Sequence, residues 1–107
     1  MRKSKSLAPG TQKKQIYLLK LYIAEGEQNS RTARENLERI CEEYRKDRFH
    51  IQEVDVLTDF ASALRDGIFV TPTLMLVAPE PKATVVGNLS DKEKVVSALR
   101  LRDPYGT

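Results

Sequence analysis

The sequence Thr71-Pro72-Thr73 leads directly into the apolar run 74–77, and it restricts the fold more than any other stretch of the chain. A proline at the start of a strand cannot donate a hydrogen bond to a neighbouring strand, so it is confined to places where no donor is needed. The bond before proline is also the one peptide bond for which the cis form costs little. We therefore expect a strand over 73–78 that begins after a cis bond between Thr71 and Pro72.

The first half of the chain predicts a strand, a helix and a second strand. Residues 16–24 are nearly all apolar, which is typical of a strand that is covered on both faces. Apolar residues then recur at three- and four-residue spacing, which predicts a helix to about residue 45 that is capped by Asn29 or Ser30. Residues 49–56 predict the second strand. A right-handed crossover makes the two strands parallel.

The second half predicts a short helix followed by an antiparallel hairpin. Asp59 or Thr58 can cap the short helix, and Gly67 suits the position just after its end. The turn after residue 78 is too short for a crossover connection, so the strand 82–86 should return antiparallel to the strand before it.

A final helix is predicted from its start and stop signals. Ser90 and Glu93 have the spacing of a capping box, in which each side chain accepts from the other's free amide. Arg100 and Arg102 favour the C-terminal end of the helix dipole, and Pro104 limits the helix.

The element order βαβαββα with one mixed sheet is typical of a three-layer thioredoxin-like sandwich, which we place in a single α/β domain over 16–103. Redox-active members of that fold carry a Cys-x-x-Cys pair at the start of the first helix, but the turn 25–30 contains no cysteine here. Cys41 is the only cysteine, which excludes an intramolecular disulfide, and its place on the apolar stripe of the helix predicts a buried structural thiol. The sequence therefore predicts the fold without its thiol chemistry.

Motifs for other catalysis are also missing from the sequence. It contains neither of the glycine-rich phosphate loops, and its single histidine, His50, excludes the usual clustered zinc sites. Asp55 could be a buried proton-transfer group, but a cap at the end of a strand is the favoured interpretation. Tyr17 and Tyr22 differ in parity, so they should project from opposite faces of the first strand. We predict a protein that is not an enzyme, needs no cofactor or metal, and acts by binding.

The net charge of +3 comes from one end of the chain. The first fifteen residues carry five lysines and arginines and no acid, which leaves 13 basic against 15 acidic residues in the remainder. A nucleic-acid-binding domain should carry its basic patch on the folded part. We therefore predict a disordered basic leader over 1–15 and a short tail over 104–107, with no nucleic-acid or membrane partner and a cytoplasmic location.

Five ordered blocks of the chain together cover about residues 16–102: Lys20-Leu21-Tyr22-Ile23-Ala24, Asn29-Ser30, Val54-Asp55-Val56-Leu57, Thr71-Pro72-Thr73-Leu74 and Gly87-Asn88-Leu89-Ser90-Asp91-Lys92-Glu93-Lys94-Val95. In this order the blocks resemble the KaiB family of bacterial clock proteins. The resemblance implies binding to a KaiC-type ATPase in a rhythmic, timing or stress-response process, with a KaiA-type protein or a histidine kinase as a further partner class. It also leaves open a KaiB-like module that serves a different signalling partner.

The resemblance also implies a choice between two folds, because KaiB proteins have a rearranged, tetrameric ground state as well as the thioredoxin-like form. Many family members have Ile-Gly-Leu-Asp where this chain has Ser97-Ala98-Leu99-Arg100. Alanine in place of glycine favours a helix by roughly 1 kcal/mol, and arginine in the last turn suits the helix dipole. We therefore expect Ala98 and Arg100, with Pro72, to favour the thioredoxin-like form.

The partner-binding residues implied by the resemblance come from both halves of the chain. Tyr17 matches a family tyrosine, and Phe49 keeps an aromatic ring near the edge of the binding face, next to His50. Gln52 and Gly67 stand where family members often have lysines that contribute to the KaiC-facing side, which weakens the implied contact. A homo-oligomer is also possible, because an exposed edge strand offers a route to dimers.

Overall fold

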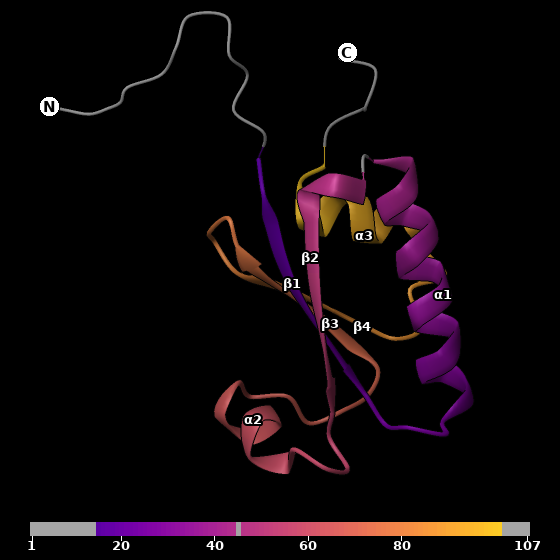
Figure 1. Ribbon diagram of the computed structural model, residues 1–107, viewed down its shortest axis with the longest axis vertical. Coiled ribbons are helices and arrows are strands. Elements are labelled where there is room, and N and C mark those ends of the chain that lie inside the picture. The colour runs from indigo at the N-terminus through magenta and orange to yellow at the C-terminus, as the bar shows by residue number, and fades with distance from the viewer. Residues whose placement is uncertain (1–14, 45, 102–107) are drawn as a thin grey trace, which may run out of the picture.

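The structure is a computed structural model that describes residues 15–44 and 46–101, so most of the predicted leader 1–15 and all of the predicted tail 104–107 lie outside the described residues. The predicted order βαβαββα is confirmed, with one additional 3-10 turn (Figure 1). The elements are β1 (Tyr17–Ile23), α1 (Gln28–Glu43), η1 (Lys46–Arg48), β2 (Phe49–Asp55), α2 (Phe60–Arg65), β3 (Thr73–Ala78), β4 (Ala83–Val86) and α3 (Lys92–Leu99).

The four strands form one mixed sheet in the order β2-β1-β3-β4. β1 pairs in parallel with β2, in a register that places Tyr17 beside Phe49 and Lys20 beside Gln52. β3 pairs antiparallel with both β1 and β4. The parallel pair and the antiparallel hairpin are therefore confirmed, and β2 and β4 are the two edge strands.

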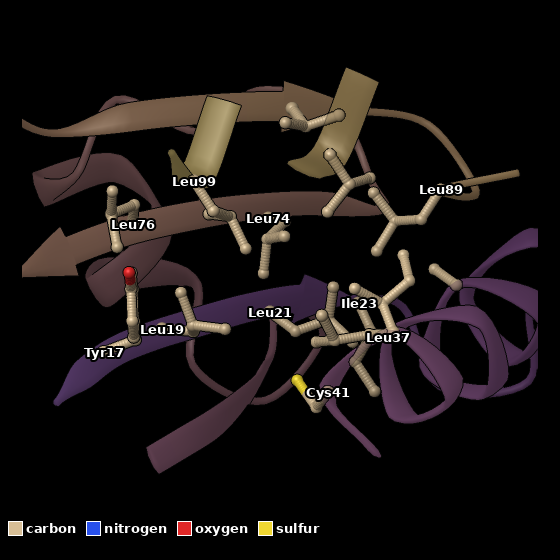
Figure 2. Packing of buried hydrophobic residues seen from close by; sticks show 14 residues of the cluster. Tyr17, Leu19, Leu21, Ile23, Leu37, Cys41, Leu74, Leu76, Leu89 and Leu99 are labelled. Atoms are coloured by element: carbon tan, nitrogen blue, oxygen red, sulfur yellow. The ribbon is translucent and has the colours of Figure 1, made fainter. Parts of the chain in front are cut away.

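The larger core lies between the sheet and the pair of helices α1 and α3 (Figures 1 and 2). Because side chains alternate along a strand, every second residue of β1 from Tyr17 to Ile23 enters this core. Cys41 contributes from α1 and is buried, as predicted. The other buried members are Leu19, Leu21, Ala33, Leu37, Ile40, Leu74, Leu76, Val85, Leu89, Val95 and Leu99.

A smaller core lies on the other face of the sheet, under α2. Tyr22 is fully buried there, which confirms that it and Tyr17 project from opposite faces. The remaining buried members are Val54, Ala63, Ile68 and Met75. α2 is too short to cover the whole face, so the side chain of Leu18 is 42% exposed. The prediction that β1 is covered on both faces is therefore wrong for its first half.

Pro72 is buried and follows a cis peptide bond, as predicted; the bonds before Pro79 and Pro81 are also cis. The ladder between β1 and β3 begins at Thr73, so Pro72 lies just outside it and no donor is lost. The carbonyl of Pro72 still accepts a hydrogen bond from the Gly87 amide at 2.9 Å, which joins the start of β3 to the end of β4.

The predicted ends of α2 are confirmed. Asp59 caps the helix by accepting from the Ser62 amide at 3.1 Å. Gly67 follows the helix with φ +74°, a conformation that favours glycine. The Ile68 amide then donates to the Ala63 carbonyl at 2.8 Å and closes the end of the helix.

The predicted caps of the other two helices are wrong. α1 begins after Glu27, so Asn29 and Ser30 lie within the helix and do not cap it. The Ser30 hydroxyl instead accepts from the amide of Ala24 at 3.1 Å. α3 is capped by Asp91, which accepts from the Lys94 amide at 3.2 Å, and Ser90 lies one residue too early to form the capping box.

The C-terminal segment is helical, which is the arrangement of the thioredoxin-like form and not of the rearranged alternative. Ala98 is half-buried within α3 and packs against the larger core. Arg100 is not in the last turn as expected: it is the C-cap, with φ +56°. Its guanidinium donates instead to the carbonyls of Pro79 and Pro81, at 3.0 and 3.3 Å. Arg102 and Pro104 lie outside the described residues.

A polar cluster ties the end of α2 to β1. The Tyr22 hydroxyl donates to Oδ2 of Asp66, and Lys20 Nζ donates to the same oxygen at 3.1 Å. The hydrogen bond from Tyr22, with help from Lys20, lowers the pKa of Asp66. Burial and the same carboxylate raise the pKa of Tyr22.

We expect Tyr22→Phe to lower the free energy of unfolding at pH 7 by about 1–2 kcal/mol, because Asp66 loses its strongest donor. A carboxyl whose pKa is lowered by folding stabilises the protein above its unfolded pKa, and that stabilisation is lost as the pH falls through the folded pKa. Urea unfolding below about pH 5 should therefore show a shallower acid dependence in the variant than in the parent protein.

Tyr17→Phe is the matched control, since the hydroxyl of Tyr17 has no hydrogen-bond partner among the described residues. It should leave the acid dependence unchanged. Equal acid dependence in the parent protein and Tyr22→Phe would contradict the role given to Asp66.

Candidate functional site

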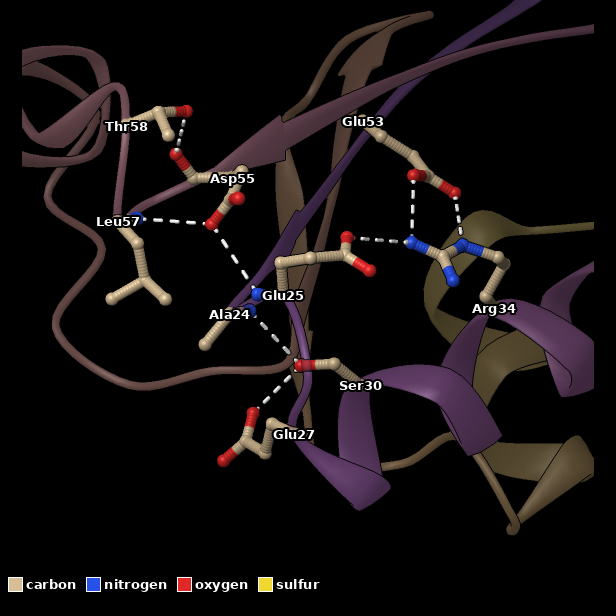
Figure 3. Close-up of polar contacts among 9 residues, drawn as sticks. All are labelled: Ala24, Glu25, Glu27, Ser30, Arg34, Glu53, Asp55, Leu57 and Thr58. Carbon is tan, nitrogen blue, oxygen red and sulfur yellow. Dashed lines mark hydrogen bonds and ion pairs between the residues drawn. The ribbon is translucent and has the colours of Figure 1, made fainter.

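Polar side chains occupy the place where redox-active proteins of this fold carry their thiols, between the start of α1 and Pro72. Glu27 Oε1 accepts from the Ser30 hydroxyl at 2.6 Å and from the Thr71 hydroxyl at 3.1 Å. Ser30 is buried, and its hydroxyl also accepts from the amide of Ala24 (Figure 3). Glu27 therefore bridges the first turn of α1 and the loop before β3, and the turn 25–30 carries no thiol.

Asp55 caps the end of β2, as the favoured interpretation predicted. Its Oδ1 accepts from the amide of Leu57 at 3.0 Å and from the amide of Glu25 at 3.3 Å (Figure 3). The carboxylate thus orders the turn after β2 and joins it to the turn after β1. With both contacts going to backbone amides, Asp55 acts as a cap and not as a proton-transfer group.

An ion pair joins α1 to the edge strand β2. Arg34 donates to both carboxylate oxygens of Glu53, at 2.7 and 3.0 Å, and lies 3.5 Å from Glu25 (Figure 3). The hydrogen bonds that Arg34 donates to Glu53 raise the pKa of Arg34. This two-pronged geometry fixes the distance between helix and strand more tightly than a single contact would.

Metal or membrane chemistry receives no support from the described part of the chain. Across residues 15–44 and 46–101, no three His, Cys, Asp or Glu side chains are placed to share a metal ion. Within the same ranges no helix is both long and apolar enough to cross a membrane.

Edge strand β2 carries three of the five predicted binding residues, which are Phe49, His50 and Gln52. A fourth, Tyr17 of β1, stacks on Phe49. The rings of Tyr17 and Phe49 stack with their centroids 5.1 Å apart, on the face of the sheet that α1 covers. Tyr17 is buried, so its ring supports Phe49 and presents little surface of its own. Phe49 is half-buried at the edge of the larger core.

His50 and Gln52 lie on the opposite face of β2, and both are exposed. The strand register sets them beside Leu18 and Lys20 of β1. Together with Val77 of β3, these side chains line a shallow hollow of about 290 Å³ on the half of the face that α2 leaves open.

A second, larger groove of about 500 Å³ lies on the other side of β2, against α1. Phe49, Ile51 and Glu53 line it from the strand, and Arg34, Leu37 and Cys41 are among the residues that line it from the helix. The side chain of Ile51 is 41% exposed. β2 is therefore open along its edge and hollowed on both of its faces.

Gly67 is not on β2, yet it belongs to the same face as Gln52. It follows Asp66, whose carboxylate holds Lys20, and Lys20 is the neighbour of Gln52 in the sheet. The structure thus separates the predicted residues into two groups. His50 and Gln52 lie on the open half of one face, and Gly67 lies on the same side of the sheet at the end of α2. Tyr17 and Phe49 lie on the face that α1 covers.

Three exposed or half-buried residues around β2 were missed by sequence reasoning: Leu18 and Lys20 on the open face, and Ile51 on the face toward α1. For Leu18 and Lys20 a signal was present in the sequence, because the charged Lys20 interrupts the apolar run of β1 two residues after Leu18, on the same face of the strand. A charged residue at that parity indicates a face that is open at its position.

Comparisons with known proteins agree on one family and one fold. A family model described as the KaiB domain matches residues 20–101. The circadian clock oscillator protein KaiB of Microcystis aeruginosa is 41% identical over 88 residues, which are 82% of this chain and 85% of that protein. The protein of the same name from Rippkaea orientalis is 40% identical over the same shares of the two chains.

Among solved structures, the N-terminal domain of SasA from Synechococcus elongatus matches with a TM-score of 0.67 at 19% identity, and the match covers 91% of this chain and 94% of that one. Mitochondrial thioredoxin 3 from Saccharomyces cerevisiae matches with a TM-score of 0.66 at 13% identity, over 80% and 78% of the two chains. At these identities the likeness shows the thioredoxin-like fold alone.

Glu27→Ala removes the acceptor shared by Ser30 and Thr71, so we expect the free energy of unfolding to fall by about 1–2 kcal/mol. Glu25→Ala is the matched control, because it removes a neighbouring carboxylate that is exposed and, among residues 15–44 and 46–101, makes one long ion pair. Its effect should stay within about 0.5 kcal/mol. Urea denaturation of both variants measures the difference, and equal effects would show that the bridge adds nothing.

We also expect that this protein does not accelerate the reduction of insulin by dithiothreitol. The position of the attacking thiol holds carboxylate and hydroxyl groups instead. A thioredoxin assayed beside it serves as the positive control. Clear turnover by the purified chain would overturn the assignment to a binding protein.

Proposed function

The chain belongs to the KaiB family of circadian clock proteins, and we propose that this clock regulator acts by binding a KaiC-type ATPase in the cytoplasm. Its output is a rhythmic or timing process, or a stress response derived from one. The observation that carries the proposal is the open edge of β2, with Phe49 on one face and Gln52 on the other, inside the region that the family model matches.

The chemistry of this edge suits contact with a protein. Leu18 and Ile51 offer exposed apolar surface, and His50, Gln52 and Lys20 offer polar groups beside it. A mixture of an apolar centre with a polar surround is typical of interfaces that form and separate. An edge strand also has backbone amides and carbonyls that are free to pair with another chain.

The groups that fix this edge are all structural, which supports a role in binding rather than chemistry. Arg34 and Glu53 hold β2 against α1, and Tyr17 stacks on Phe49 from beneath. A surface that is rigid before it meets its partner loses less conformational entropy on binding. The same rigidity would serve a KaiA-type protein or a histidine kinase, the further partner classes implied by the family.

A second candidate is a KaiB-like module that no longer binds KaiC and serves another signalling partner. It is favoured by Gln52 and Gly67, which stand at positions where family members often carry lysines. With Gln52 in place of lysine, the open face has one cation fewer to offer an acidic partner surface.

We expect this protein to co-elute with the KaiC-type ATPase of its own organism in size-exclusion chromatography with light scattering, in at least one of the ATP and ADP states. Gln52→Glu should weaken the complex by about tenfold or more, because it places a carboxylate on the open face of β2. Thr84→Glu is the matched control: it adds the same charge to the same face but on β4, the opposite edge strand.

A complex that is weakened equally by both variants would place the contact elsewhere on the sheet. Absence of any complex in every nucleotide state would exclude the KaiC-type partner and leave the second candidate.

A further inference from the structure

The groove of about 500 Å³ between edge strand β2 and α1 exists because the helices cover the central strand and not its neighbour. Leu19 of β1 and Ile51 of β2 are partners in the parallel ladder. Leu19 lies in the larger core and is 2% exposed, whereas Ile51 is 41% exposed although it lines the side of β2 that faces α1. This face of the edge strand is therefore left uncovered. We call the space the α1–β2 groove.

The inner surface of the α1–β2 groove is apolar and fixed by the core. Leu21, Leu37 and Cys41 line it, and each is at most 2% exposed because it also belongs to the larger core (Figure 2). Phe49 and Ile51 line the strand side, and the ring of Phe49 is held in place by its stacking on β1. A concave, mostly apolar surface of this volume is typical of sites that bind small organic molecules.

The mouth of the groove carries an excess of negative charge. Arg34 donates to both oxygens of Glu53 and lies 3.5 Å from Glu25, so its positive charge already faces two carboxylates (Figure 3). Glu38 also lines the groove, is exposed, and has no hydrogen-bond or ion-pair partner among the residues that the structure describes. One guanidinium against three carboxylates leaves a net charge of −2. A cleft whose charges have mainly one sign attracts a ligand of the opposite sign.

We propose that the α1–β2 groove binds a small organic cation with an apolar body of about one ring and one protonated amine. The apolar body would be removed from water against Phe49 and Ile51, and the amine would donate to the carboxylate of Glu38. Because the groove is open and Glu38 is exposed, a single-ring ligand should bind weakly, with a dissociation constant of about 0.1–1 mM. The groove lies on the face of β2 opposite Gln52, so the proposal does not depend on the contact proposed there for an ATPase.

A titration of the full chain followed by NMR, with three ligands of similar shape and different charge, tests the proposal near neutral pH. Phenethylamine is the cation, phenethyl alcohol the neutral analogue and hydrocinnamate the anion. The amide signals of Leu37, Glu38 and Ile51 should shift to saturation with phenethylamine. The dissociation constant should be about threefold or more larger for the alcohol and about tenfold or more larger for hydrocinnamate.

Two variants separate the charged contact from the apolar one. Glu38→Gln should raise the dissociation constant of phenethylamine to near that of the alcohol and leave the alcohol unaffected, since it removes a charge and keeps the shape. Glu35→Gln is the matched control, because it removes the same charge from an exposed position of the same helix that does not line the groove. Ile51→Ser should weaken both ligands by about threefold or more, because it removes part of the apolar wall.

Four outcomes would overturn the proposal. They are no saturable shift with phenethylamine at about tenfold above the expected dissociation constant, equal affinities for the three ligands, shifts confined to residues outside the groove, and equal effects of Glu38→Gln and Glu35→Gln. Every measurement uses the chain alone, so none of these outcomes bears on whether the protein binds a KaiC-type ATPase.

Discussion

β1 is paired on both sides, and the alternation of its side chains divides the molecule into two cores of unequal size. Tyr17 and its alternate neighbours build the larger core under two helices, whereas Tyr22 anchors the smaller one under α2. Because α2 is short, the sheet face above Leu18 and Lys20 stays open. The candidate binding surface is therefore what remains when one strand is covered by two helices on one face and by a single short helix on the other.

Where redox-active proteins of this fold carry their thiols, this chain has polar side chains that join separate elements. Glu27 and Ser30 join the start of α1 to the loop that precedes β3 through Thr71, while Asp55 joins the ends of β1 and β2. The contacts of Glu27 link the parallel half of the sheet to the loop before the antiparallel strand β3, whereas those of Asp55 stay within the parallel half. In this chain the start of α1 is joined to the loop before β3 by polar contacts, and the surface that we propose for recognition lies at the opposite end of the strands, along the edge of β2.

Sequence reasoning was most successful where local chemistry decides the structure. Pro72, Asp59 and Gly67 behave as predicted because backbone stereochemistry and neighbouring amides determine their roles. It failed for the helix caps predicted at Ser30 and Ser90. The Ser30 hydroxyl accepts from the amide of Ala24 instead of capping α1, and Asp91, the residue after Ser90, caps α3. The separation of Phe49 from Gln52 follows from strand alternation, but which face stays open depends on the length of α2, a property of packing between distant segments.

Arg100 joins the end of α3 to the turn between β3 and β4. The hairpin runs from β3 through the turn at Pro79 and Pro81 into β4, the chain continues into α3, and the guanidinium of Arg100 returns to the carbonyls of that same turn. The chain connection holds the start of α3 to β4, and the Arg100 hydrogen bonds hold its end to the hairpin turn. A helix whose last residue is bonded to a distant turn unfolds locally together with that turn and does not fray from its own end. Local unfolding of α3 should therefore accompany opening of the turn between β3 and β4.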